Sequence, residues 1–183
     1  PTIQFLHKAG AAVAILSHLG SPKTEKYDSD YSLAPVANYL TEALEMKVPL
    51  IVEWLEDLQV GPGEIVMLEN IRFASGEKYN TDALARKMAT LCNVYCNGAC
   101  ASARREQSSV HWIAKYLPLA YTVPLFVREV EALSRAVENV DHPLTFLLGG
   151  MRIPETKFDL ISAQLDKADH LMLAGVIGNT FLK

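Results

Sequence analysis

The 183-residue sequence has few cysteines and no long apolar run. Cys92, Cys96 and Cys100 are odd in number and close together, so they match neither a disulfide framework nor a zinc site. We expect small, reduced core residues in a cytoplasmic protein. Apolar runs such as residues 144–148 are far shorter than the roughly 20 residues that cross a bilayer, and no basic-then-apolar leader opens the chain. The sequence therefore predicts no membrane span and no membrane partner.

An excess of basic residues is also missing. The chain carries 17 Lys and Arg against 21 Asp and Glu, a formal net charge of −4. Nucleic-acid-binding proteins usually present a broad basic surface that neutralises phosphates, so we expect no nucleic-acid partner. Any anion site has to be local. No Gly-x-Gly-x-x-Gly motif opens a helix, which disfavours a dinucleotide-binding module.

Half of the residues are hydrophobic, and they fall into short apolar runs that alternate with segments of helical spacing. Strand candidates are residues 12–17, 48–52, 64–69, 93–97, 144–148 and 170–174, and helix candidates are 33–46, 81–91, 125–138 and 158–167. Continuous apolar runs are typical of parallel strands that helices cover on both faces. We therefore predict an α/β fold in which the six runs form a parallel sheet flanked by helices, a Rossmann-like three-layer sandwich.

A division of the chain is predicted near residue 140. Residues 138–143 separate a long helix from a new apolar strand, so we expect one lobe over 1–140 and the start of a second α/β lobe over 141–183. The chain opens within a helical stripe that includes Ile3 and Leu6, although such a helix normally follows an earlier strand. It also stops soon after its last strand. We expect a piece of a longer α/β protein.

Candidate binding residues follow the predicted strands. In an open parallel sheet, ligands bind outside the carboxyl ends of the strands. His18 follows the first strand, Arg72 the third, and Asn97 and Arg105 the fourth. Arginine offers a planar fork of donors to phosphate or carboxylate, and histidine can add another donor. Each residue alone is equally well a solvated loop cation or a structural histidine, but together they predict an anion pocket.

The last two strands end in glycines. Gly149 and Gly150 follow the fifth strand, where paired glycines would let the backbone approach a ligand closely, although such a pair also makes ordinary turns. Arg152 and Lys157 come next and could meet phosphates. Gly175 follows the sixth strand, which indicates either the wall of a nucleotide site or a tight strand-to-helix turn.

Six short motifs occur along the chain. They are Ser-His-Leu-Gly-x-Pro at 17–22, Ser-Leu-Ala-Pro-Val at 32–36, Leu-Glu-Asn-x-Arg-Phe at 68–73, Ile-Ala-Lys-Tyr-Leu-Pro at 113–118, Leu-Gly-Gly at 148–150 and Asn-Thr-Phe-Leu-Lys at 179–183. In order and approximate spacing they resemble the phosphoglycerate kinases. The resemblance covers the whole chain.

The resemblance implies a two-lobed glycolytic enzyme of the cytoplasm. Its N-terminal lobe would hold 3-phosphoglycerate or 1,3-bisphosphoglycerate, its C-terminal lobe would hold ATP or ADP with Mg²⁺, and hinge closure would bring the lobes together. We expect a monomer whose metal ligands lie outside this chain. The implied substrate-binding residues are His18, Arg72, Asn97 and Arg105; the implied catalytic residues are Arg105 and Lys157; the implied nucleotide-binding residues are Gly149, Gly150, Arg152, Lys157 and Gly175.

Several ligand loops depart from the family pattern. Ser21 stands where the family has an arginine, and Met151-Arg152 replace an Ala-Lys pair. Ala174-Gly175-Val176 replace three glycines. Since arginine does not simply replace a lysine that follows a moving phosphoryl group, a second hypothesis stays open. It is a catalytically inactive, degraded or truncated family member that serves as a phosphate-binding or interaction domain.

Overall fold

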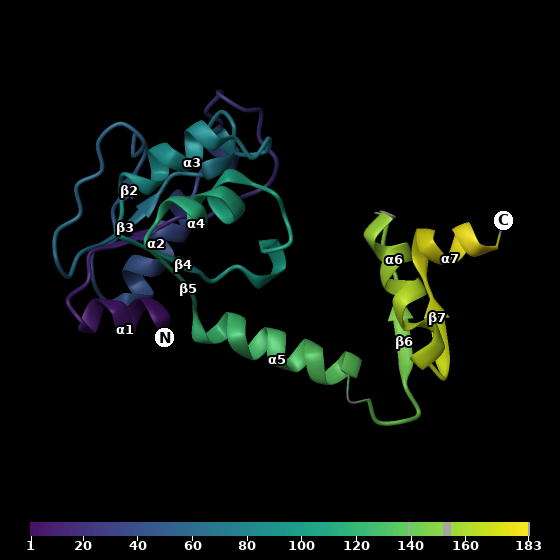
Figure 1. Cartoon of the computed structure of the whole chain (residues 1–183). Coiled ribbons are helices and arrows are strands. Elements are labelled where there is room, and N and C mark those ends of the chain that lie inside the picture. The colour runs from purple at the N-terminus through teal and green to yellow at the C-terminus, as the bar shows by residue number, and fades with distance from the viewer. Residues whose placement is uncertain (139, 152–154, 183) are drawn as a thin grey trace. The chain divides into compact units, whose positions relative to one another are not determined.

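The computed structural model describes residues 1–138, 140–151 and 155–182 (Figure 1). The chain divides into two compact units, Pro1–Val127 and Arg128–Lys183. The division point lies within helix α5, Pro124–Glu138. The lobe boundary expected after residue 140 stays a prediction. Among the described helices, none combines the length and the apolar character needed to cross a bilayer.

The first unit is built on a parallel sheet of β1 (Val13–Ile15), β2 (Leu50–Ile51) and β3 (Ile65–Leu68). Their order is β1-β3-β2, and Val13 lies opposite Ile65. All four residues of the central strand β3 are buried. The continuous apolar run at 64–69 therefore forms the covered strand that its sequence predicts.

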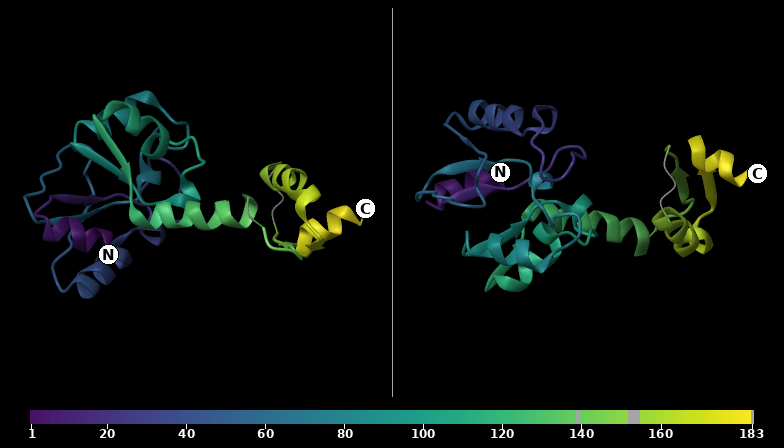
Figure 2. Two further views of the ribbon diagram at one scale, coloured as in Figure 1. Left: turned by 60° about the horizontal axis from the view of Figure 1, so that its bottom comes forward. Right: turned by 90° about the horizontal axis from the view of Figure 1, so that it is seen from above.

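Helices cover both faces of this sheet (Figures 1 and 2). Successive side chains of a strand point to opposite faces. Ile65 and Met67 pack in one cluster with residues of α1 (Thr2–Lys8) and α2 (Ala34–Leu44). Val66 and Leu68 pack in another, which draws on α3 (Asp82–Ala89) and α4 (Ile113–Tyr116). The predicted three-layer α/β arrangement is confirmed in this unit.

A second, two-stranded parallel sheet in this unit consists of β4 (Val94–Asn97) and β5 (Leu119–Thr122). The expectation that six runs make one sheet is wrong for the part of the chain that the structure describes, because the strands there pair into three separate sheets. An apolar run indicates burial but does not encode which strand supplies the hydrogen-bonding partner. Sequence analysis did not predict β5, whose four residues are all exposed.

Short helical turns complete the first unit. They are the 3₁₀ turns η1 (Ser29–Tyr31), η2 (Ile71–Phe73) and η3 (Cys100–Ser102), and the π-helical turn η4 (Ser108–Trp112). Cys92 lies between α3 and β4, Cys96 on β4 and Cys100 on η3, and Cys96 is exposed. The expectation that all three are core residues is therefore wrong for Cys96, which lies on the exposed face of a half-covered strand.

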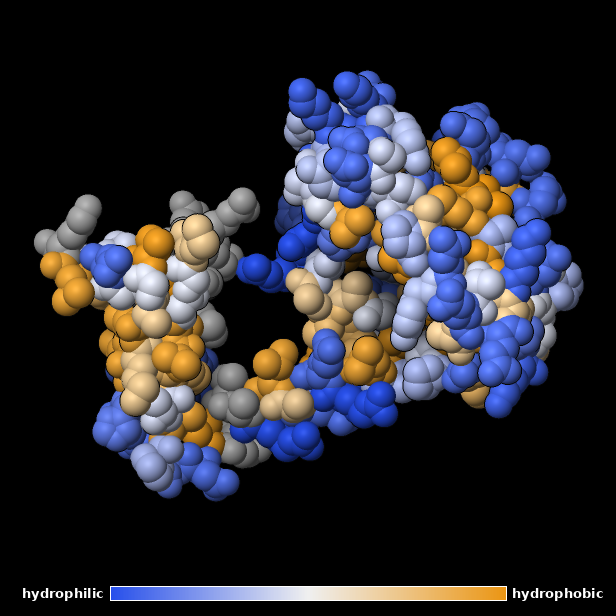
Figure 3. Space-filling view, turned by 180° about the vertical axis from the view of Figure 1, so that it is seen from behind, coloured by the Kyte–Doolittle hydropathy of each residue, from blue (hydrophilic) through white to orange (hydrophobic). Residues whose placement is uncertain are grey.

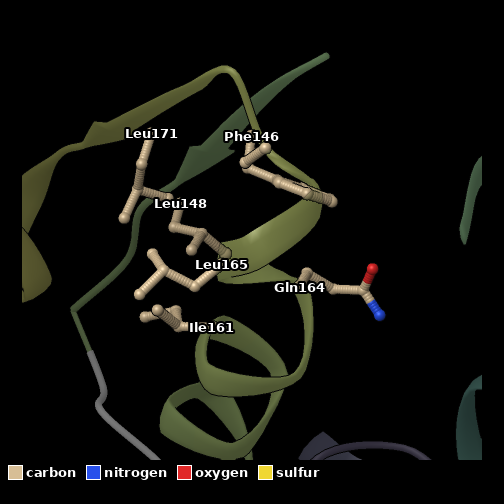
Figure 4. A pocket seen from close by; sticks show the side chains of 7 residues that line it. Phe146, Leu148, Ile161, Gln164, Leu165 and Leu171 are labelled. Atoms are coloured by element: carbon tan, nitrogen blue, oxygen red, sulfur yellow. The ribbon is translucent and has the colours of Figure 1, made fainter. Parts of the chain in front are cut away.

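The second unit pairs β6 (Thr145–Leu148) in parallel with β7 (His170–Leu173). Its helical elements are α6 (Glu155–Gln164), the 3₁₀ turn η5 (Leu165–Lys167) and α7 (Gly175–Phe181). Apolar side chains reach its surface (Figure 3). Apolar side chains line a small pocket of this unit, and the Gln164 amide points away from them (Figure 4). They belong to Phe146, Leu148, Ile161, Leu165 and Leu171, none of which is buried.

Candidate anion-binding site

The loop after β1 carries His18 and is shaped by Gly20. Gly20 has a φ of +59°, and a Cβ added there would lie 2.3 Å from a ring carbon of Tyr31. Only glycine adopts this conformation and also leaves room for the ring. The Ser17 carbonyl accepts a hydrogen bond from the Ile71 N–H at 3.2 Å. The loop is thereby joined to η2, the turn that carries Arg72.

Asn70 connects these segments directly. Its side-chain nitrogen Nδ2 donates to the carbonyls of Leu19 and Tyr31 at 2.8 and 2.9 Å. Its Oδ1 accepts from the Arg72 backbone N–H at 3.1 Å. The residue is only 2% exposed, so these bonds replace water that cannot reach it.

Glu69 fixes the start of α2 next to the same strand end. Its carboxylate accepts from Ser32 Oγ at 2.7 Å and from the backbone N–H groups of Leu33 and Asn70 at 2.8 and 2.7 Å. Buried carboxylates require such donors. Sequence reasoning gave neither Glu69 nor Asn70 a role, although two adjacent polar residues ending an apolar run were a usable signal.

His18, Arg72 and Arg105 share one electrostatic environment. Burial lowers the pKa of His18, and the positive charges of Arg72 and Arg105 lower it further. Burial likewise lowers the pKa of Arg72, as does the neighbouring charge of Arg105. Each shift disfavours the charged form: burial is the larger cause and repulsion between the like charges the smaller, while the negative charge of Glu77 partly opposes the shift of Arg72. An anion bound among these groups would relieve that repulsion.

The Arg72 guanidinium is held against the loop that follows His18. Its Nη1 donates to the Gly20 carbonyl and to Ser21 Oγ, the latter at 3.3 Å. Ser21 therefore contacts the cluster as a neutral acceptor and adds no positive charge of its own.

Glu77 is a buried negative charge near this cluster. It is 2% exposed and accepts from Ser109 Oγ at 2.6 Å and from the Ser109 N–H at 3.0 Å. Burial raises the pKa of Glu77, while the Ser109 bonds and the charge of Arg72 oppose that rise. Burial, with Glu77 nearby, also raises the pKa of Tyr95 to about 12, and the Tyr95 hydroxyl donates to the Ser109 carbonyl at 2.9 Å. Sequence analysis assigned Glu77 no role.

Arg105 follows β4 as predicted, whereas Asn97 is the last residue of that strand, and the two side chains are placed differently. Asn97 is half-buried, and its Oδ1 accepts from the Ala99 N–H at 2.9 Å, so the side chain shapes the turn after the strand. Arg105 is exposed, and its N–H donates to the Ser102 carbonyl at 2.9 Å. The electrostatic shifts link Arg105 to His18 and Arg72, and they give no such link for Asn97. The ligand roles of all four residues stay predictions.

In the second unit, the glycines after β6 and β7 lie against each other. The Val176 N–H donates to the Gly150 carbonyl at 3.1 Å. Gly175 has a φ of +62°, and a Cβ there would lie 3.1 Å from the same carbonyl oxygen. The Gly149–Gly150 and Gly175 segments thus form one backbone surface. Arg152 lies outside the described residues, and so does the side chain of Lys157, whose backbone belongs to α6.

Metal ligands do not gather in the part of the chain that the structure describes. No three His, Cys, Asp or Glu side chains there are grouped to hold an ion.

A parallel α/β sandwich with clustered cations beyond its strand ends defines the class of α/β proteins suited to phosphorylated ligands. Comparison with known proteins narrows the class. The family model described as phosphoglycerate kinase matches residues 1–183. The chain belongs to the phosphoglycerate kinase family, and the resemblance found in its motifs is confirmed.

Proteins of similar sequence and similar structure support the same family. The chain is 47% identical to the phosphoglycerate kinase of Coxiella burnetii and 43% identical to that of Legionella pneumophila, in each case over its full length and 46% of the relative. The solved structure of the C. burnetii enzyme matches with a TM-score of 0.84, over 100% of this chain and 46% of that one. The phosphoglycerate kinase structure from Pyrococcus horikoshii, 29% identical, matches 99% of this chain and 47% of its own with a TM-score of 0.83. The chain spans about half the length of the curated relatives it matches.

Proposed function

We propose that this chain is part of a protein that carries out the phosphoglycerate kinase reaction, in which a phosphoryl group moves between 1,3-bisphosphoglycerate and ADP to give 3-phosphoglycerate and ATP. Residues 1–140 would form the phosphoglycerate lobe, and residues 141–183 would begin the nucleotide lobe. The observation that carries the proposal is the shared environment of His18, Arg72 and Arg105 in a chain of this family.

The chemistry of this reaction depends on positioning and charge neutralisation, since phosphoryl transfer needs no covalent intermediate with the protein. Arg72 and Arg105 offer guanidinium donors to the phosphate and carboxylate of phosphoglycerate. The pKa of His18 is lowered in the free protein, and an anion bound beside it would raise its affinity for a proton. Asn97 would lie beside the ligand.

The nucleotide side is proposed for the second unit. The backbone at Gly149, Gly150 and Gly175 would approach ADP or ATP, with Arg152 and Lys157 meeting its phosphates. Lys157 and Arg105 would neutralise charge on the transferring group. Mg²⁺ would arrive with the nucleotide as part of the substrate. We also propose a monomer in the cytoplasm.

One observation favours the second candidate, a phosphate-binding family member without catalysis. Ser21, which replaces the family's arginine, accepts a hydrogen bond from Arg72 where a further cation would be expected. Such a loop could still bind an anion while orienting it less firmly.

Calorimetric titration of the chain with 3-phosphoglycerate, and separately with MgADP, tests the proposal. We expect 3-phosphoglycerate to bind and Arg105→Ala to weaken that binding. Lys115→Ala is the matched control, because Lys115 is a cation that lies 3.8 Å from the Trp112 ring centroid. Absence of 3-phosphoglycerate binding, or equal weakening by both variants, would refute the anion site.

A further inference from the structure

Asn70 occupies an unusual place in the first unit, since one buried side chain joins its own turn, η2, to two points on the connection between β1 and α2. Both of its side-chain N–H groups are used, for Leu19 and Tyr31, and its oxygen is used for Arg72. An amide is the only uncharged side-chain group that offers two donors and an acceptor in this way. Asn70 itself directly follows Glu69 at the end of β3, so its hydrogen bonds fix the position of these segments relative to the central strand of the sheet.

The three partners of Asn70 surround the cationic cluster. Leu19 directly follows His18 in the chain. Tyr31 packs its ring against Gly20, whose carbonyl accepts from the Arg72 guanidinium. The third partner is the backbone N–H of Arg72 itself. The Asn70 amide thus holds the backbone of Leu19 next to His18, the backbone of Tyr31, whose ring packs against Gly20, and the backbone of Arg72.

We propose that Asn70 is a positioning residue that sets the spacing between the His18 imidazole and the Arg72 guanidinium, so that the pair receives a single phosphoglycerate anion. The inference deepens the proposed function and rests on it for the identity of the anion. The spacing itself is a property of the free protein. It can therefore be measured without any ligand.

The chemistry of alternative side chains sharpens the inference. Aspartate would keep one oxygen as the acceptor for the Arg72 N–H. Its second oxygen would face the carbonyls of Leu19 and Tyr31 without a proton to donate, and its negative charge would lie beside the cations. Alanine leaves the carbonyls of Leu19 and Tyr31 and the N–H of Arg72 without partners at a nearly inaccessible position. Serine has one donor and cannot reach both carbonyls. Alanine and serine thus release the loops without adding a charge that would itself move the pKa of His18.

The experiment compares Asn70→Ala with Thr41→Val in the full chain. Thr41 is the matched control, because its Oγ1 also joins two backbone groups, the Ala37 carbonyl and the Val48 N–H, each at 3.0 Å. Thr41 lies on α2 and contacts no residue of the cationic cluster through these bonds. For each protein, NMR titration gives the pKa of His18 without ligand, calorimetry gives the 3-phosphoglycerate affinity, and urea unfolding gives the stability.

We expect Asn70→Ala to return the pKa of His18 toward its ordinary value and to weaken 3-phosphoglycerate binding by about tenfold or more. Thr41→Val should lower stability and leave both readouts unchanged. A purely structural role would make the two variants alike, with lower stability and wild-type His18 pKa and affinity, and would overturn the inference. If Asn70→Ala does not fold, Asn70→Ser is judged by the same readouts. If the wild-type chain binds no 3-phosphoglycerate, the proposed function fails, while the His18 pKa still decides whether Asn70 positions the pair.

Discussion

The central strand of the first unit and the two strands of the second unit arise from similar apolar runs but end in different surroundings. β3 is buried at every position, and Met67 is 0% exposed. β6 and β7 alternate between exposed and half-buried residues, and Leu147 is 72% exposed. Burial is therefore a property of the layers packed on a strand. An apolar run only permits it.

The two units also differ in how their candidate sites are built. In the first unit, buried polar residues fix the loops around His18 and Arg72 through side-chain hydrogen bonds. In the second unit, the described part of the candidate nucleotide site consists of backbone contacts between glycine segments. The first unit thus carries a prearranged cation cluster, and the second carries a surface for close backbone approach.

The largest expected effect separates binding from turnover. The 183-residue chain should bind 3-phosphoglycerate but should show no ATP-dependent turnover of it, because it spans 46% of its relatives and transfer needs both ligands held in line. Ser21→Arg should not restore turnover, since one added charge cannot replace missing nucleotide contacts. A coupled assay checks both statements. Turnover that requires both substrates and is lost in Arg105→Ala would show that these residues suffice.

The contrast in burial predicts the next effect. Met67→Ala should lower the free energy of unfolding by about 2–5 kcal/mol, because it opens a cavity between α1, α2 and the sheet. Leu147→Ala should change it by no more than about 0.5 kcal/mol, since the side chain already meets solvent. Urea unfolding of both variants measures the difference. Similar losses at the two positions would mean that Leu147 is covered in solution.

Arg72→Ala tests whether the cation cluster serves binding or folding. Charge-assisted contacts contribute about 1.5–3 kcal/mol each, so the free energy of 3-phosphoglycerate binding should become less favourable by that amount. Stability should change much less, because the like charge of Arg105 opposes Arg72 in the free protein. Calorimetry and thermal unfolding give the two quantities. A large fall in melting temperature with little change in affinity would make Arg72 a structural residue.

The smallest expected effect concerns pH. Because burial raises the pKa of Glu77, the folded protein keeps this proton at pH values where the unfolded chain has lost it. The stabilising contribution is therefore complete below the ordinary carboxyl pKa and is lost as pH rises through the raised pKa of the folded state. Glu77→Gln should remove this pH dependence, with a change on the order of 1 kcal/mol. Urea unfolding at several pH values checks it; identical pH profiles of the two proteins would contradict the prediction.

Sequence reasoning located the strands well and their pairing poorly. All six predicted strands are present, because apolar runs bounded by turn residues report local structure directly. The predicted helix at 158–167 begins earlier, at Glu155, and gives way after Gln164 to a 3₁₀ turn. β5 was not predicted, and its four residues are exposed although Leu119, Ala120 and Tyr121 are apolar. Pairing partners depend on contacts between distant segments.

The candidate site shows the same limit. Cations that follow strands could be identified from position alone, which placed His18 and Arg72 on neighbouring loops. The supporting residues could not, because Glu77 and Asn70 matter through partners 32 and 51 residues away in sequence. A buried carboxylate or amide has no local signature. Its meaning comes from the groups that the fold brings to it.

Glu69 and Asn70 have a further consequence for how β3 finds its place in the sheet. A strand that is apolar on both faces tolerates a shift of one residue, since the exchanged side chains remain apolar. Here such a shift would pull Glu69 and Asn70 away from the four hydrogen-bonding partners that lie outside their own segment, Ser32, Leu33, Leu19 and Tyr31. Misalignment would thus leave buried polar groups unsatisfied, a cost that rises with every lost bond. Glu69 and Asn70, which organise the binding loops, therefore also favour one register of β3 over its shifted alternatives.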